Sequence, residues 1–314
     1  MKVLFHTILC SWLFSIGLGD LSLPPSLRAR QSDQSSSSST SSTTTKPPLR
    51  HDSSPPPSSE TEGVSIHVVG GQATDAQRYS YTVSLQDPSG YHLCGGTVVA
   101  PDIILSAAHC ADAGITMAVV GIHDLSELST GNIEVFAFKK MYLHPDYNDA
   151  TTDYDALIIK LDGIVTVTDP VRINNDYSLP NPSNVLTVVG WGATSDDGAV
   201  YPTLQQEADL FYVSNRLCKR ITDDNGYSYG SELFDDMMCA SDYGKSACFG
   251  DSGGPLLLLG ATPWDDIQIG VVSFGVDCAS PIPSVYHRIS YSYEWIRTMV
   301  CSRSAAPPDY FSCF

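Results

Sequence analysis

The sequence has few basic residues for its length. Its 314 residues include 17 lysines and arginines against 35 aspartates and glutamates, which gives a formal net charge of −18. Five residues of each sign precede Val68, so the chain from Val68 onward carries the whole acidic excess. Binding to nucleic acid or to an anionic membrane needs clustered lysine and arginine, and we expect neither partner. The excess of negative charge favours basic protein partners, but a role in keeping the protein soluble explains this excess equally well.

Long apolar runs are missing after the first 19 residues. Residues 1–19 combine Lys2, an apolar stretch and the small residues Gly17 and Gly19, which is the pattern of a secretory signal peptide and too short for a membrane span. Because no later stretch reaches about 18 apolar residues, we expect a mature protein that is soluble and secreted.

Residues 20–67 lack apolar surface and are rich in serine, threonine and proline. Such a segment cannot offset the entropy of ordering, so we interpret it as a disordered pro-segment, with a plain spacer as the alternative. The composition becomes globular at Val68. We therefore expect one globular domain over residues 68–302 and a C-terminal tail over residues 303–314.

The sequence has no CxxC pair and no Asn-x-Ser/Thr acceptor for N-glycosylation, because Asn181 is followed by Pro182. The first absence argues against a zinc site. Nine cysteines minus Cys10 of the signal peptide leave an even number, which in a secreted chain indicates four disulfides whose pairing cannot be found by counting. These eight are Cys94, Cys110, Cys218, Cys239, Cys248, Cys278, Cys301 and Cys313.

Helical periodicity is scarce, and short β-rich runs recur between turn signals, which favours an antiparallel barrel or sandwich. The predicted strands are 81–86, 102–108, 117–121, 133–138, 156–161, 185–192, 268–274 and 283–289. One helix is predicted, over residues 289–300, where Ile289, Tyr293, Ile296 and Val300 share a face.

Three separated segments carry residue types used in nucleophilic catalysis. LSAAHC (105–110) contains His109, DYDALIIKL (153–161) contains Asp155, and GKSACFGDSGGPL (244–256) contains Ser252 among four glycines. A serine hydroxyl needs an imidazole to take its proton and a carboxylate to hold that imidazole. Taken singly, each residue has a plainer reading: a buried hydrogen-bonded histidine, a strand-end acid and a surface turn.

Together these segments resemble the chymotrypsin/trypsin-like serine peptidases. The resemblance covers residues 68–300 and rests on VVGG (68–71), CGGT (94–97), LSAAHC (105–110), DAL (155–157), GWG (190–192), GDSGGP (250–255) and SFG (273–275). It implies an all-β fold of two packed six-stranded antiparallel β-barrels with a C-terminal α-helix. It also implies a secreted serine endopeptidase that cleaves protein or peptide substrates without a cofactor.

By this resemblance, Ser252 attacks the scissile carbonyl, His109 is general base and then general acid, and Asp155 orients His109. Asp153 is the rival for the orienting role. The backbone N–H groups of Gly250 and Ser252 would bind the oxyanion, which explains the glycines of the loop.

The resemblance further implies a zymogen. Cleavage before Val68 would free an α-amino group that pairs with Asp251, the acid before the nucleophile. The residue before Val68 is His67, where tryptic activation needs arginine or lysine. We therefore expect another activating protease.

The family's disulfides correspond to Cys94–Cys110, Cys218–Cys239 and Cys248–Cys278, and Cys301–Cys313 is the simplest pairing for the remaining two. In the primary pocket, Ser246 forms an uncharged floor, Gly275 leaves one wall open and Ser284 narrows the other. Ser273 and Phe274 complete the substrate-binding segment. We therefore expect a preference for medium to large apolar side chains, although Asp277 near the rim could attract a basic one.

No metal site is expected. The stretch 121–134 lies where trypsins often bind calcium, but Ile122 stands near the position of the first acidic ligand. A catalytically silent homologue that binds or inhibits other proteins is the alternative function, and the presence of His109, Asp155 and Ser252 argues against it.

Overall fold

The computed structural model describes residues 70–127, 132–195, 197–278 and 280–313. The signal peptide and pro-segment predicted for residues 1–67, and Val68 itself, lie outside these ranges. Within the described ranges, no helix is long and apolar enough to cross a membrane.

The first half of the described chain forms a closed β-barrel with the strand order β2-β3-β4-β7-β6-β5. Its strands are β2 (Thr82–Gln86), β3 (His92–Ala100), β4 (Ile103–Ser106), β5 (Met117–Val120), β6 (Glu134–Leu143) and β7 (Leu157–Leu161). Every pairing is antiparallel. The branched side chains of β4 and β7 are buried on both faces of the barrel wall, and Ile103, Ile104 and Ile158 have no exposed surface.

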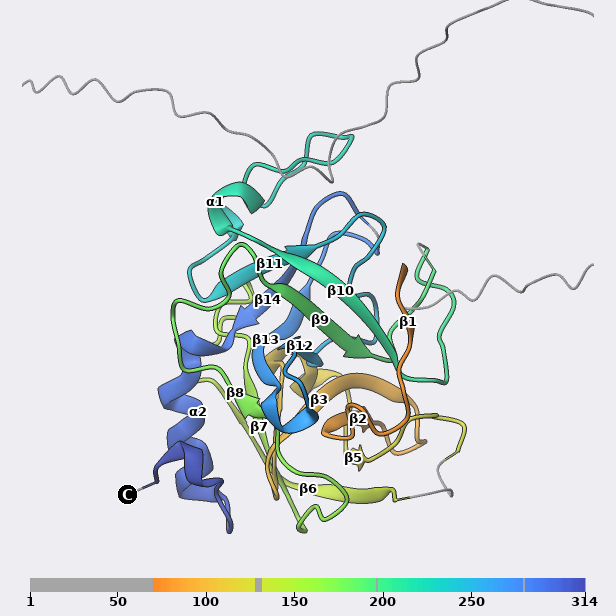
Figure 1. Ribbon diagram of the computed structural model, residues 1–314, viewed down its shortest axis with the longest axis vertical. Helices are drawn as coiled ribbons and strands as arrows, with labels where there is room; N and C mark the ends of the chain where they lie inside the picture. Colours follow the sequence, from red (N-terminus) through yellow and green to blue (C-terminus); the bar gives the residue numbers. More distant parts are fainter. Residues whose placement is uncertain (1–69, 128–131, 196, 279, 314) are drawn as a thin grey trace, which may run out of the picture. The chain divides into compact units, whose positions relative to one another are not determined.

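The second half forms another antiparallel barrel, drawn in green to blue in Figure 1. Its strands are β9 (Val185–Gly190), β10 (Gln206–Val213), β11 (Met237–Ser241), β12 (Pro255–Leu258), β13 (Ile267–Phe274) and β14 (Ser284–Arg288). The sheet runs β10-β11-β14-β13-β12-β9, and the pairing of β10 with β9 closes it. Two short strands join from outside: β1 (Gln72–Ala73) pairs with β10, and β8 (Arg172–Ile173) lies parallel to β13.

The all-β prediction of two six-stranded antiparallel barrels with a C-terminal helix is thus confirmed. The predicted helix, α2 (Ile289–Arg303), extends three residues beyond the predicted end at residue 300. The remaining helical turns are short: η3 (Ala108–Asp112), α1 (Asn215–Cys218), η4 (Gly230–Glu232), η5 (Pro263–Asp265) and η6 (Asp309–Phe311).

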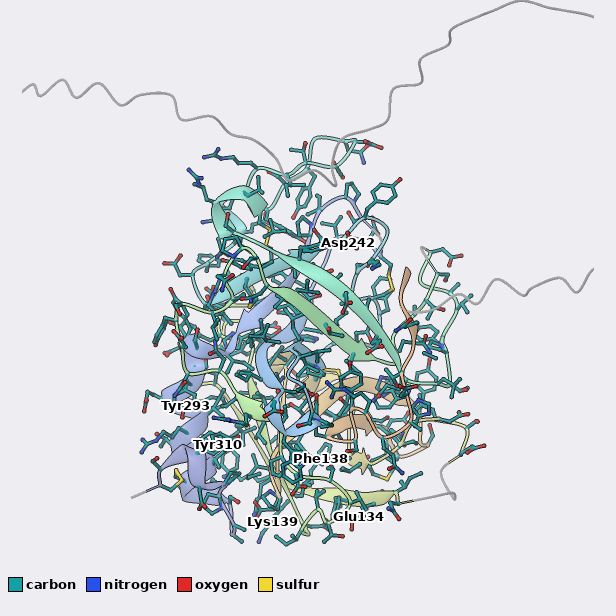
Figure 2. The ribbon with its side chains drawn as sticks, in the orientation of Figure 1. Glu134, Phe138, Lys139, Asp242, Tyr293 and Tyr310 are labelled. Carbon is teal, nitrogen blue, oxygen red and sulfur yellow. A yellow bond between two sulfur atoms is a disulfide. The ribbon has the colours of Figure 1, made fainter. Side chains whose placement is uncertain are left out.

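Helix α2 and the tail after it connect the two barrels. The helix follows β14 of the second barrel, yet Ile296, Val300 and the tail residue Phe311 are buried in the core that holds the first barrel's strands. Phe311 packs between Tyr293 and Tyr310, with ring centroids 6.3 and 4.4 Å away, and Figure 2 shows both tyrosines on the α2 side of the molecule. Apolar burial therefore holds the tail on the first barrel.

Polar contacts fix the same tail. Asp102 of the first barrel accepts hydrogen bonds from Ser304 Oγ (2.6 Å) and Ala305 N (2.9 Å) and pairs with Lys160. Arg297 of α2 donates to the carbonyls of Phe311 and Ser312, each at 2.7 Å. The tail is an ordered part of the domain.

Candidate functional site

The pairing of β4 with β7 places His109 and Asp155 at the same end of the first barrel. Ser106 at the end of β4 is opposite Leu157 at the start of β7. His109 follows Ser106 by three residues, in η3, and Asp155 precedes Leu157 by two. Their side chains meet there: His109 Nδ1 lies 2.8 Å from Asp155 Oδ2, and the His109 backbone N–H donates to Asp155 Oδ1 at 2.9 Å.

The Asp155 carboxylate is buried and hydrogen-bonded on both oxygens. Ser273 Oγ, from the second barrel, donates to Oδ2 at 2.5 Å, and the residue is 1% exposed. Burial raises the pKa of this carboxyl, but the hydrogen bonds and charge interaction with His109, together with the Ser273 hydrogen bond, outweigh it and leave the pKa below its usual value. With Nδ1 held by a carboxylate, Nε2 is the ring nitrogen left to take up a proton.

Asp153, the alternative partner for His109, has a different neighbour. Its Oδ2 accepts a hydrogen bond from Thr151 Oγ1 at 2.9 Å. Burial raises the pKa of its carboxyl above the usual value. Of the two acids, the structure brings Asp155 to the histidine.

The loop that carries Ser252 is held by both barrels. The Ser252 carbonyl accepts from Gly95 N of β3 at 2.7 Å, and Gly253 N donates to the Val272 carbonyl of β13 at 2.9 Å. Gly253 has φ +79°, and a Cβ there would lie 2.6 Å from the Gly95 carbonyl oxygen. A side chain at this position would therefore force the loop away from the first barrel. Ser252, which is partly exposed, consequently lies at the junction of the barrels, where Ser273 reaches Asp155.

Gly250, two residues earlier, also has a left-handed backbone, with φ +98°. Its carbonyl lies 2.9 Å from Nε2 of His92, whose Nδ1 lies 2.8 Å from Ser84 Oγ. A carbonyl only accepts, so Nε2 carries the proton and Nδ1 accepts from the serine. Burial lowers the pKa of His92 to about 4, and the ring is neutral near neutral pH. The sequence analysis missed His92.

Asp251 is buried to the same degree as Asp155, with 1% exposure, but its partners are backbone groups. Its oxygens accept from Gly192 N at 2.8 Å and Cys248 N at 2.9 Å. Burial raises its pKa to about 6, against the lowering effect of these hydrogen bonds. A Cβ on Gly192 would lie 2.7 Å from Asp251 Oδ1, so glycine is required for the carboxylate to enter.

Of the residues expected to shape the primary pocket, Ser273 and Phe274 lie on β13 and Ser284 lies on the adjacent β14, whereas Ser246 lies in the loop after β11 and Gly275 directly follows β13. Ser246, Ser273 and Ser284 are buried, Phe274 is half-buried and Gly275 is exposed. A Cβ on Gly275 would lie 3.9 Å from Ser284 Oγ, so these two residues face each other.

Within the described residues there are four disulfides, Cys94–Cys110, Cys218–Cys239, Cys248–Cys278 and Cys301–Cys313. The first three are the pairs that the resemblance implied, and the fourth is the pairing expected for the two cysteines that remained. Among the described residues, the group with metal-ligand spacing is Cys94, His109 and Cys110. Because both sulfur atoms are joined in a disulfide, this group offers no thiolate to an ion.

A cavity of about 760 Å³ is lined in part by residues that neighbour Asp155 and Ser273 in sequence, and the sequence analysis did not predict it. Three segments line it: residues 150–152 before Asp155, residues 227–234 between Cys218 and Cys239, and residues 274–276 after β13. No local motif could have revealed it, since its walls come from parts of the chain far apart in sequence.

Comparisons with known proteins agree with this geometry. The sequence model of the Trypsin family matches residues 68–296. The chain is 34% identical to serine protease 28 of Mus musculus over 248 residues, covering 74% of this chain and 88% of the relative. It is 35% identical to trypsin theta of Drosophila melanogaster over 240 residues, covering 76% and 86%.

The chain belongs to the trypsin family of serine peptidases. The family match begins at Val68 and ends within α2, so the tail lies beyond it. In this trypsin-family chain the matched region includes His109, Asp155 and Ser252, and the match supports the peptidase class predicted from the motifs.

Proposed function

We propose that this protein is a secreted serine endopeptidase in which Ser252, His109 and Asp155 form the catalytic triad. The observation that supports this most directly is the 2.8 Å contact between His109 Nδ1 and Asp155 Oδ2 at the barrel junction, beside the loop that carries Ser252.

In this mechanism, Ser252 Oγ attacks the carbonyl carbon of the scissile peptide bond while His109 Nε2 accepts the hydroxyl proton. The resulting imidazolium is stabilised by Asp155 and then donates its proton to the leaving amine, so the amine departs and an acyl-enzyme remains. Water, deprotonated by His109, then attacks the acyl carbon, the bond to Ser252 Oγ breaks as Oγ takes the proton back from His109, and the acid product leaves. Asp155 is a positioning residue that keeps the proton on Nδ1 and leaves Nε2 available.

The negative charge on the carbonyl oxygen would be bound by the backbone N–H groups of Gly250 and Ser252. The left-handed backbone of Gly250 supports this role, because a turn of this kind brings successive N–H groups to one side. The hydrogen bond between His92 and the Gly250 carbonyl helps to fix that peptide.

We further propose that the chain is made as a zymogen and is activated by cleavage between His67 and Val68. A buried carboxylate without a cation is costly, and burial already raises the pKa of Asp251 to about 6. The ammonium group of a new N-terminus at Val68 would pair with it and stabilise the surrounding loop. Because His67 does not suit a trypsin-like activator, a protease of another specificity would make the cut.

For the primary pocket we propose medium to large apolar side chains. The serines at positions 246 and 284 leave the pocket without a carboxylate that would bind lysine or arginine, and the exposed Gly275 leaves room. The predicted signal peptide and the four disulfides support an extracellular location.

The test uses full-length protein carrying His67→Arg, which immobilised trypsin can cut before Val68 and from which the trypsin is then removed. We expect a fluorophosphonate probe to label the cut protein at one equivalent, and the uncut protein and the Ser252→Ala control not to be labelled. N-terminal sequencing identifies the new end. Cut protein that begins at Val68 and takes no label would instead support the catalytically silent homologue.

The pocket is tested with the same cut protein and a panel of chromogenic peptides. We expect Phe, Tyr, Leu or Met to be preferred over Arg at the cleaved position. A tenfold or greater preference for Arg, about 1.4 kcal/mol, would overturn the assignment.

A further inference from the structure

The cavity of about 760 Å³ is built in part by a loop that the catalytic proposal does not use. This loop runs from Cys218 to Cys239, whose disulfide closes it. It supplies Tyr227, Tyr229, Glu232 and Phe234 to the cavity wall.

Two walls of the cavity are close in sequence to residues of the proposed triad site. One wall contains Thr151, four residues before Asp155. Another contains Phe274, whose neighbour Ser273 donates its hydroxyl to Asp155. A peptide lying along residues 273–275 toward Ser252 would therefore pass the cavity, and one of its side chains can enter it.

Aromatic rings form one side of the cavity. The rings of Tyr227 and Tyr229 meet edge to face with centroids 6.2 Å apart, and those of Tyr229 and Phe274 do so at 5.7 Å. Tyr229 is buried, and its hydroxyl donates to the Pro283 carbonyl at 2.9 Å, which fixes the centre of the row. Tyr227 and Phe234 are 41% and 37% exposed, so their surfaces remain available to a ligand.

One carboxylate stands at this aromatic row. Glu232 Oε2 accepts a hydrogen bond from the Tyr227 hydroxyl at 2.9 Å. Of the described residues that line the cavity, Glu232 is the one with a carboxyl group, and lysine and arginine are absent from the lining. Aromatic faces with a neighbouring carboxylate attract a cation, and a guanidinium fits best because it is planar and hydrogen-bonds to a carboxylate at two points.

We propose that this cavity binds an arginine side chain of the substrate, at a position not adjacent to the scissile bond, and that Glu232 determines this specificity. The proposal rests on the proposed peptidase function. Together with the apolar primary pocket, it defines a substrate with an apolar residue at the cleaved bond and a basic residue a short distance away.

The experiment uses cut His67→Arg protein and peptides with Phe at the cleaved position. Arginine, or its uncharged counterpart citrulline, is placed in turn at each of the neighbouring positions. We expect arginine to raise kcat/KM about tenfold over citrulline at one position, through its ion pair and ring contacts. Glu232→Gln should reduce this advantage to less than about twofold, and Glu232→Lys should reverse it in favour of a glutamate peptide.

Asp235→Asn is the matched control, because Asp235 is an exposed acid of the same loop and does not line the cavity. It should keep the arginine preference. An arginine advantage that survives Glu232→Gln, or that is equally lost in Asp235→Asn, would overturn the assignment of Glu232.

A binding measurement separates this proposal from the catalytic one. Cut protein with Ser252→Ala is titrated with the same fluorescent peptides, and we expect arginine to bind about tenfold more tightly than citrulline, as in catalysis. Selective binding by protein that shows no activity before Ser252→Ala is introduced would retain the cavity assignment and refute the peptidase function. Equal affinity for the two peptides, or binding of neither, would refute the cavity assignment.

Discussion

Asp155 and Asp251 are equally buried, but the pKa values of their carboxyl groups are shifted in opposite directions. Each is 1% exposed. Asp155 has an imidazole and a hydroxyl as partners, and its pKa lies below the usual value. Asp251 has two backbone N–H groups, and its pKa rises to about 6. Burial alone therefore does not set the charge state of a carboxyl; the partner does. Asp155 is already stabilised by residues of the described domain, whereas the charged form of Asp251 gains from an added cation.

Replacement of Asp155 should have the largest effect. Asp155→Asn removes the acceptor that holds the proton on His109 Nδ1, so we expect kcat to fall about 10⁴-fold in cut protein. Steady-state hydrolysis of a Phe peptide measures it. Asp153→Asn is the control and should keep kcat within about threefold, because Asp153 contacts Thr151 rather than the histidine. Similar losses of kcat in both variants would contradict the assignment of Asp155, rather than Asp153, as the residue that positions His109.

The second prediction concerns the pH dependence of stability in the uncut chain. Since the folded-state pKa of Asp251 is about 6 and the unfolded value is about 3.9, the folded state holds the proton more tightly. Stability is therefore lost as pH rises from about 4 to about 6, and the loss from this residue reaches about 3 kcal/mol above that range.

Urea unfolding of uncut Ser252→Ala protein at pH 4 and pH 7 measures this loss, and the double variant Ser252→Ala/Asp251→Asn subtracts all other titrating groups. We expect the free energy of unfolding to fall by about 2 kcal/mol more between pH 4 and pH 7 in the single variant than in the double variant, because at pH 4 the unfolded carboxyl is already about half ionised. After cleavage before Val68 the difference should disappear, because the new ammonium favours the carboxylate. The same pH dependence in cut and uncut protein would contradict the proposed pairing of Val68 with Asp251.

A smaller effect should come from the support behind Asp155. Tyr154, the preceding residue, has φ +53°, and its N–H donates to Asp236 Oδ2 at 2.6 Å. Asp236→Ala removes that acceptor, so we expect kcat to fall about tenfold through poorer placement of Asp155, with KM nearly unchanged. Asp236→Asn keeps an acceptor oxygen and should recover most of the loss. A fall in KM or stability without a change in kcat would show that Asp236 does not position the triad.

The strands found from sequence are those whose apolar pattern reflects simple burial, such as β4 and β7. The missed strands β3, β10, β11 and β12 depend on tertiary contacts. In β3, a Cβ on Gly96 would lie 2.8 Å from Ile104 Cγ2, and one on Gly95 would lie 2.8 Å from the Cα of Gly254. Gly96 therefore leaves room for the side chain of Ile104, and Gly95 leaves room for the backbone of the loop that carries Ser252. Glycine in a sequence normally argues against a strand, so β3 was not predicted.

Candidates for the triad could be named from the sequence because nucleophilic catalysis restricts residue type and local turn geometry at each position. His92 could not, since its partner Gly250 is 158 residues away and no motif marks the contact. The proposed role of Glu232 could not be predicted either, because the cavity that it lines is completed by residues 150–152 and 274–276, which are distant in sequence.

The tail after α2 has a mechanical consequence for the proposed triad. His109 and Asp155 belong to the first barrel, and Ser252 lies on a loop that leads into β12 of the second. Helix α2 leaves the second barrel and, with Phe311 and the bonds from Ser304 and Ala305 to Asp102, is anchored in the first. Residues 289–311 thus run from one barrel to the other, and we expect them to oppose a relative movement of the barrels that would separate Ser252 from His109.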